Sequence, residues 1–136
     1  MKQTLFAVLC GALLAASCKK TKEEAPPPEP TYHLNLSKDL IQAPAPGDTT
    51  TVDIDANAAW KATIPAGTDW LTVSATSGNG DAELEVRINK VNNTGARRTA
   101  NITIALVNGR APAKQITVEQ EFEVVNTITL DWKKLY

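Results

Sequence analysis

The residue types that carry out most enzyme chemistry are scarce in this chain. His33 is the only histidine among 136 residues, so a histidine-based triad would have to use it. One histidine is also too few for a zinc site, which takes several His or Cys ligands. Glu83 and Glu85 are two residues apart, which on a strand places both on one flat wet face and not across a cleft. With no nucleophile-elbow, zinc-protease or phosphate-loop motif, we expect no catalytic residue, no cofactor and no enzyme activity.

A second kind of chemistry to consider is non-covalent contact with a sugar. Proteins hold sugars by stacking an aromatic ring on the apolar face of the sugar, flanked by hydrogen-bonding side chains. Trp60 lies at the same alternate positions as the apolar residues Ala62 and Ile64, so we interpret it as a core residue. Trp70 has the opposite parity to Leu71, so it either caps the sandwich or stands partly exposed. The candidate ligand contacts are Trp70, Asn79, Asp81, Asn92 and Asn93.

The four polar candidates come from two loops that could form one rim. The alternative is that both loops only make turns, because Asn and Gly tolerate positive φ. The turn at Asn79–Asp81 also offers oxygen atoms, but it lacks a recognised calcium-ligand spacing. We therefore expect no metal.

The N-terminus reads as an export signal. Met1-Lys2 is a short basic start, Leu5 to Ala16 is small and apolar, and small residues precede Cys18. The run is too short to span a bilayer as a mature helix. A cysteine directly after such a cleavage site is typical of a bacterial lipoprotein, so we expect a signal peptide at residues 1–17 and lipidation of Cys18. The folded part then has no thiol and no disulfide.

Residues 18–31 carry the lipidated cysteine and a tether. Residues 19–31 mix four prolines with charges and show no apolar periodicity, which favours an extended, solvated segment. Lys22-Glu23-Glu24 resembles the charge signals that some lipoproteins use to reach the outer face of the outer membrane. We expect an outer-membrane, lipid-anchored, surface-exposed protein. The formal net charge of −1 argues against a nucleic-acid partner.

From Tyr32 onward the chain alternates apolar and polar residues with a period of two, as half-buried strands do. Turn residues separate the runs. This predicts an all-β fold, an immunoglobulin-like antiparallel β-sandwich of about seven strands over residues 32–122. Residues 123–136 form a C-terminal extension with one further candidate strand, Val124 to Leu130, and with Trp132 and Tyr136 near its end. The clearest alternating runs are Val52–Asp55, Trp60–Ile64, Leu71–Ala75, Glu83–Ile88, Asn101–Leu106 and Ile116–Glu119.

Several landmarks fall in an order that resembles a known family. They are Ala59-Trp60-Lys61-Ala62, Trp70-Leu71-Thr72-Val73-Ser74, Ser77-Gly78-Asn79-Gly80, Leu84-Glu85-Val86, Arg98-Thr99-Ala100-Asn101-Ile102-Thr103-Ile104 and Ile116-Thr117-Val118-Glu119-Gln120. Over about residues 33–121 this sequence resembles the BACON domain, named as Bacteroidetes-associated and often carbohydrate-binding. The resemblance implies a seven-stranded immunoglobulin-like sandwich in exported proteins, many of them surface enzymes and lipoproteins of gut bacteria. It also implies non-catalytic carbohydrate binding, with mucin as a suggested target, or a spacer role.

Two functions from different classes follow. The first is a lipid-anchored accessory protein of the cell envelope that binds carbohydrate or mucin glycans without catalysis. The alternative is a structural spacer or a protein-interaction module of an envelope complex, using an edge strand or the segment from Trp132 to Tyr136 on a protein partner. We expect no attached enzyme domain, which weakens the idea that the sandwich targets its own catalyst.

Overall fold

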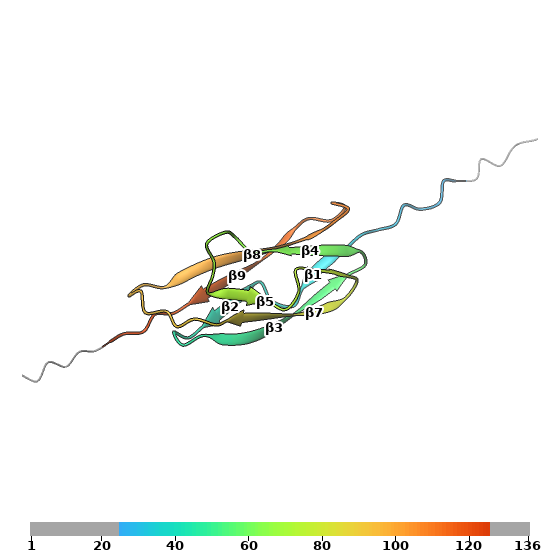
Figure 1. Cartoon of the computed structure of the whole chain (residues 1–136). Coiled ribbons are helices and arrows are strands. Elements are labelled where there is room, and N and C mark those ends of the chain that lie inside the picture. The colour runs from blue at the N-terminus through green and yellow to red at the C-terminus, as the bar shows by residue number, and fades with distance from the viewer. Residues whose placement is uncertain (1–24, 126–136) are drawn as a thin grey trace, which may run out of the picture.

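The structure is a computed structural model that describes residues 25–125. This part of the chain contains nine strands and no helix (Figure 1). The strands are β1 (Leu34–Leu36), β2 (Leu40–Ala43), β3 (Asp48–Ala56), β4 (Ala59–Thr63), β5 (Leu71–Val73), β6 (Ser77–Asn79), β7 (Ala82–Ile88), β8 (Arg98–Leu106) and β9 (Lys114–Gln120).

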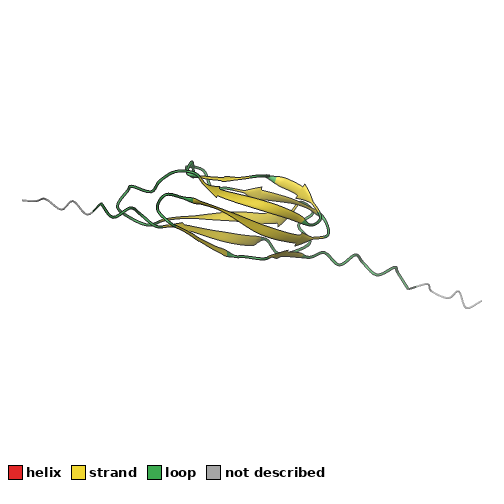
Figure 2. Cartoon of the chain, turned by 90° about the horizontal axis from the view of Figure 1, so that it is seen from below, coloured by secondary structure: helices red, strands yellow, loops and turns green. Residues whose placement is uncertain are grey.

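The strands form two sheets that pack face to face, so the predicted all-β sandwich is confirmed (Figure 2). The four-stranded sheet has the order β1-β3-β7-β5, and the five-stranded sheet has the order β2-β9-β8-β4-β6. The prediction of an antiparallel sandwich needs one correction, because β2 runs parallel to β9. Three strands were not predicted: β1, β2 and β6, each of only three or four residues.

The core forms because every long strand buries alternate residues. In β8, for example, Ala100, Ile102, Ile104 and Leu106 are buried while their neighbours face outward. The same alternation in β3 and β7 supplies the facing layer, including Val52 and Leu84, and in β9 it extends the layer of β8 with Val118; all three side chains are fully buried. With no thiol in this region, apolar burial of this kind provides the main favourable free energy of folding.

The two long sides of the sandwich are closed in the same way. On one side the chain runs along the four-stranded sheet as β1 and then joins the five-stranded sheet as β2; on the other side β5 and β6 make the same change. Each side of the sandwich is therefore a single stretch of chain that contributes a short edge strand to both sheets. Short edge strands are one device by which natural sheets limit edge-to-edge pairing.

The two ends of the described chain leave opposite ends of the sandwich (Figures 1 and 2). Residues 25–33 precede β1 without regular structure, and Val124 and Val125 lie outside any strand. The predicted signal peptide, Cys18, and the remainder of the predicted C-terminal strand fall outside the described residues. Among residues 25–125, no helix is long and apolar enough to cross a membrane.

Candidate functional site

Trp60 belongs to the core, as its strand parity predicted. It is 1% exposed, and its Nε1 donates a hydrogen bond to the carbonyl of Gly80 at 3.0 Å. Its ring covers Gly78 in the neighbouring edge strand β6, where a Cβ would lie 2.4 Å from the Cζ2 atom. A ring enclosed in this way is not available to a ligand.

Trp70 was a candidate ligand contact, and the sequence left open whether it caps the sandwich or stands partly exposed. The side chain is only 7% exposed, and the guanidinium of Arg98 lies over the ring, 4.6 Å from its centroid. Trp70 immediately precedes β5, so the alternation that applies within the strand does not decide its direction. It caps the end of the sandwich, the first of these two options, and the Arg98 guanidinium takes up the face a sugar would need.

Asn92 needs correction as a candidate ligand contact, because it is fully buried. Its Nδ2 donates to the carbonyls of Ala96 at 2.8 Å and Gln120 at 3.2 Å, and its Oδ1 accepts from the hydroxyl of Thr94 at 2.7 Å. Its backbone N–H donates to the carbonyl of Ala45. Asn92 is a structural residue that fastens the β7–β8 loop to β9, and no part of it faces solvent.

The other candidates are exposed but do not lie together. Asn79 and Asp81 precede the first residue of β7, whereas Asn93 follows the last. The seven residues of β7 span roughly 20 Å, so the two loops are at opposite ends of the sandwich. The two loops therefore do not form one rim, which was one of the two alternatives left by the sequence. Asp81 accepts a hydrogen bond from the backbone of Ala56 at 3.0 Å, which gives it a structural role in the β6–β7 turn.

Acidic side chains line a shallow depression of about 490 Å³ on the outer face of the four-stranded sheet, beside this turn. The carboxylate of Asp55 accepts hydrogen bonds from the side chains of Asn35 and His33. Both bonds lower the pKa of this carboxyl group below the ordinary value, and the bond from Asn35 has the larger effect. The Nε2 atom of His33 bonds to this carboxylate, and the backbone N–H of His33 donates to Oδ1 of Asn57. Within residues 25–125 no group of three His, Cys, Asp or Glu side chains is placed to hold a metal ion. The acidic residues of the depression are Asp53, Asp55, Asp81 and Glu83.

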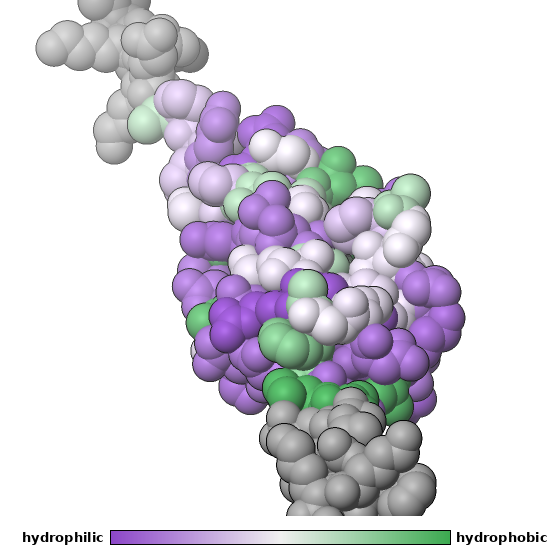
Figure 3. Space-filling view, turned by 90° about the vertical axis from the view of Figure 1, so that its left-hand side faces the viewer, coloured by the Kyte–Doolittle hydropathy of each residue, from purple (hydrophilic) through white to green (hydrophobic). Residues whose placement is uncertain are grey.

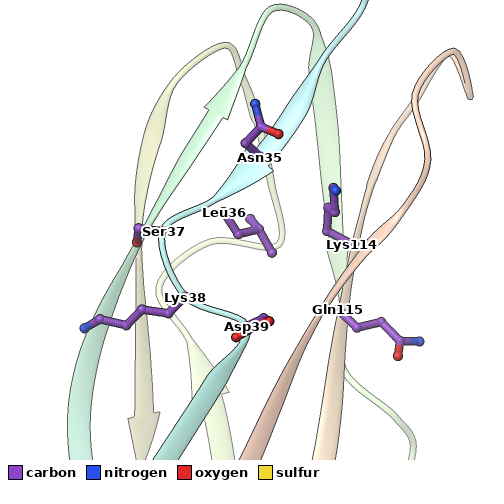
Figure 4. Close-up of a pocket in the computed structure, with 7 residues that line it drawn as sticks. All are labelled: Asn35, Leu36, Ser37, Lys38, Asp39, Lys114 and Gln115. Carbon is purple, nitrogen blue, oxygen red and sulfur yellow. The ribbon is translucent and has the colours of Figure 1, made fainter.

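A second depression is a groove of about 340 Å³ at the place where β1 passes into β2 (Figure 4). The sequence did not point to it, because no motif marks it. It opens where the chain leaves one sheet for the other, opposite the start of β9. The lining residues are Asn35, Leu36, Ser37, Lys38, Asp39, Lys114 and Gln115.

Only some of these side chains are available to a ligand. The hydroxyl of Ser37 accepts a bond from the backbone of Asp53, and Lys38 donates to the carbonyl of Thr51. In Figure 4 both lie on the β3 side, whereas Leu36 and Asp39 lie between β1 and β9. No ion pair involves Asp39 or Lys114 within the described part of the chain. The groove thus offers a carboxylate, an ammonium and an amide around one apolar side chain.

The end of the domain from which the C-terminal segment leaves has a different surface. Figure 3 looks onto this end and shows hydrophilic residues over most of it, with hydrophobic ones beside the departing chain. Val124 and Val125 are 66% and 73% exposed, and Val91 is 50% exposed. The backbone of Glu123 donates to the carbonyl of Asn92 at 2.8 Å, which brings these three valines to the same end. Trp132 and Tyr136 lie outside the described residues.

Comparisons with known proteins agree with this architecture. Residues 58–121 match the model of the family described as "BACON: Putative binding domain, N-terminal". No curated protein matches the chain. Among solved structures, the chain is similar to a Bacteroides ovatus GH5 xyloglucanase in complex with a XXXG heptasaccharide, with 26% identity and a TM-score of 0.59. That match covers 69% of this chain and 19% of the xyloglucanase chain.

Two further solved structures have lower identity. One is WR4, a C. elegans member of the MSP family, with 16% identity, a TM-score of 0.45, and coverage of 66% of this chain and 97% of that one. The other is the BIgI domain of beta protein from S. agalactiae bound to CEACAM1, with 16% identity, a TM-score of 0.38, and coverage of 68% and 99%.

The match to the family model spans the strands from β4 to β9 and includes both buried tryptophans and Gln120, the last residue of β9. The order of landmarks in the sequence, the two-sheet sandwich and the family match agree. Residues 58–121 of this chain belong to the BACON family of binding domains.

Proposed function

We propose that this chain is a non-catalytic accessory module of the cell envelope whose domain binds carbohydrate. The observation that carries the proposal is the similarity at 26% identity to one part of a xyloglucanase whose structure is in complex with a heptasaccharide. The description of the matching family as a binding domain supports it. The described part of the chain also contains only one histidine, and the imidazole of His33 bonds to the carboxylate of Asp55 and not to a nucleophile.

The groove between β1 and β9 is the surface that suits this role best. Its volume of about 340 Å³ lies within the range of small-molecule sites. Leu36 can pack on the apolar face of a sugar ring, while Asp39, Lys114 and Gln115 can bond its hydroxyls. Because both tryptophans of the described residues are buried, recognition there would rest on hydrogen bonds and not on aromatic stacking.

The position in the cell remains part of the proposal. The basic start, the apolar run and Cys18 support export followed by lipidation, and Lys22-Glu23-Glu24 supports the outer face of the outer membrane. Several acyl chains on one cysteine would make the attachment stable, since one chain alone binds a membrane only marginally. Glycans, including those of mucins, would then be accessible to the domain.

A specific observation favours a second candidate, a structural spacer. The chain enters the sandwich at one end and leaves it at the other (Figure 1). A domain with this geometry separates whatever precedes it from whatever follows it by its full length. A spacer needs no ligand, so this role is compatible with a surface that lacks an exposed aromatic platform.

Binding to a glycan array distinguishes the two candidates. The variant Lys114→Ala/Gln115→Ala removes two groove side chains for which the structure gives no internal hydrogen bond, and Lys61→Ala, exposed on β4, is the matched control. Carbohydrate binding through the groove predicts a loss of affinity of about tenfold or more, about 1.4 kcal/mol, in the double variant alone. Equal binding by all three proteins would place the site elsewhere. A folded wild-type chain that binds no glycan would favour the spacer.

A further inference from the structure

The edge of the sandwich formed by β5 and β6 differs from the opposite edge. Residues 71–80 run along the four-stranded sheet, bend at Ser74–Thr76 and continue along the five-stranded sheet. Both strands are the last in their sheets, so one side of this whole stretch has no neighbouring strand in the described chain.

In both strands, before and after the bend, the odd-numbered residues are the ones whose backbone N–H and C=O groups face outward. In β5, the bonds from Ser74 N to Glu85 O and from Asn89 N to Trp70 O show that even-numbered residues pair with β7. In β6, the bonds from Ala62 N to Thr76 O and from Gly80 N to Ala58 O show that even-numbered residues pair with β4. Because residues of an antiparallel strand alternate in the direction of their N–H and C=O groups, the odd-numbered residues direct theirs away from the domain. These residues are Leu71, Val73, Ser77 and Asn79 in the two strands.

This edge lacks the charged and proline residues that often protect a sheet edge, and the shortness of β5 and β6 is the protection that remains. Residues 71–80 read LTVSATSGNG, without a charge or a proline, in a chain that is 21% charged. The opposite edge has Lys38 and Asp39 at the point where β1 passes into β2. Natural sheets protect their edges with charged residues, especially lysine, and with proline. Both edges therefore have short strands, but only the edge formed by β1 and β2 also carries charged residues.

We propose that the β5–β6 edge pairs with the same edge of a second copy of this chain. Antiparallel pairing of one edge with itself around a two-fold axis is self-complementary, since each outward N–H meets an outward C=O of the partner. Because residues 71–80 are uncharged, the two copies bring no like charges together along the edge. The bonds formed are main-chain hydrogen bonds of the type by which strands are added to an exposed sheet edge.

Hydrogen exchange of the whole chain, purified in a mild detergent, tests this pairing. At low concentration the amides of Leu71, Ser77 and Asn79 should exchange quickly, because they have no partner inside the domain. At high concentration they should slow by roughly tenfold or more. The amides of Thr72 and Gly78 pair within the domain and should be protected at both concentrations. Sedimentation velocity should show the mass rising from one chain toward two over the same range.

A pair of variants at one position separates edge pairing from other association. Ser77→Pro removes an outward N–H without removing a bond inside the domain and should keep the protein monomeric, whereas Ser77→Ala keeps the N–H and should associate like wild type. Protection at Gly78 reports whether Ser77→Pro remains folded; if it does not, Asn79→Lys provides the same test through like-charge repulsion. A wild-type chain that stays monomeric with unprotected odd-numbered amides would overturn the proposal, as would equal association of both Ser77 variants. Neither result bears on carbohydrate binding in the groove between β1 and β9.

Discussion

The end of the domain that contains Trp70 is held by a buried polar network centred on Gln120. Its Nε2 donates to the carbonyls of Ala45 at 2.7 Å and Lys90 at 2.9 Å, and its Oε1 accepts from Nε of Arg98 at 2.8 Å. The side chain is fully buried, and each of its polar atoms has a partner. One residue thus connects the β2–β3 loop, the β7–β8 loop and the start of β8.

We expect Gln120→Leu to be strongly destabilising although it keeps the volume of the side chain. It removes three hydrogen bonds, one to the carbonyl of Ala45, one to that of Lys90 and one from the guanidinium of Arg98, and each such bond contributes about 1 kcal/mol. Urea unfolding followed by tryptophan fluorescence should show a loss of about 3 kcal/mol in the free energy of unfolding. Gln115→Leu, on the exposed part of the same strand, is the control and should change it little. Equal losses in both variants would argue against the network.

The carboxylate of Asp55 gives a prediction about pH. Hydrogen bonds from Asn35 and His33 lower its pKa in the folded state, so the ionised form favours folding. This contribution to stability is fully present above about pH 4, which is the pKa of an aspartate in the unfolded chain. It is lost as the pH falls through the lower pKa that Asp55 has in the folded state. Asn35→Ala should raise the folded pKa of Asp55 and shift acid unfolding to higher pH, as measured by NMR titration and by circular dichroism.

Asn101→Ala, which removes an exposed asparagine on the other sheet, should leave the Asp55 titration unchanged. The hydrogen bond from Asn35 is the largest cause of the low pKa. An unaltered titration in Asn35→Ala would therefore show that this bond is not formed in solution.

At the scale of elements, β4 and β6 illustrate how a glycine can be required for packing instead of for a turn. The Trp60 ring lies against Gly78, and Gly78 pairs with Trp60 in the ladder between the two strands. We expect Gly78→Ala to cost about 2 kcal/mol, since its Cβ would lie 2.4 Å from a buried ring atom. Thermal unfolding should show the loss. Ser77→Ala, the neighbouring position in β6, should leave the stability close to wild type, and a stable Gly78→Ala would mean that β6 is not held against Trp60.

The six long alternating runs were sufficient to predict the sandwich, and all six are strands. The pattern missed β1, β2 and β6, which have three or four residues each, because so short an alternation cannot be told from a loop; β5 is as short but was predicted because the alternation in the sequence continues to Ala75. Ser77-Gly78-Asn79 reads as a turn by composition, yet it forms β6 because Trp60 requires a glycine opposite it. The parallel pairing of β2 with β9 was not predictable, since strand direction depends on how the chain crosses between sheets.

The candidate site was harder to predict than the fold. Strand parity placed Trp60 correctly but does not apply to Trp70, which lies just outside β5. Composition marked Asn92 as a turn residue, yet a buried hydrogen-bond network fixes it. The groove at Asp39 and Lys114 joins residues that are 75 positions apart, and no local pattern reports such a meeting.

At the scale of the whole molecule, the arrangement of the two ends sets what the domain can do. The chain enters beside Leu34 and leaves beyond Gln120 at the opposite end (Figure 2). The nine residues of β8 span roughly 30 Å, and a tether of the length of residues 19–31 could add at most about 40 Å. If Cys18 is the membrane anchor, the C-terminal end of the sandwich is the part of the domain farthest from the bilayer.

Energy transfer from a single dye to acceptors in the membrane measures this orientation. Val107→Cys labels the end of the sandwich near the tether, since the backbone N–H of Val107 donates to Ala59 at the start of β4, and Glu123→Cys labels the other end. With the chain anchored in vesicles, transfer should be weaker from Glu123 than from Val107. Deletion of residues 20–30 should raise transfer at both labels, with Val107 still the higher. Equal transfer from the two labels would mean that the domain lies along the membrane, and it would contradict the spacer role, because a domain lying flat separates nothing from the bilayer.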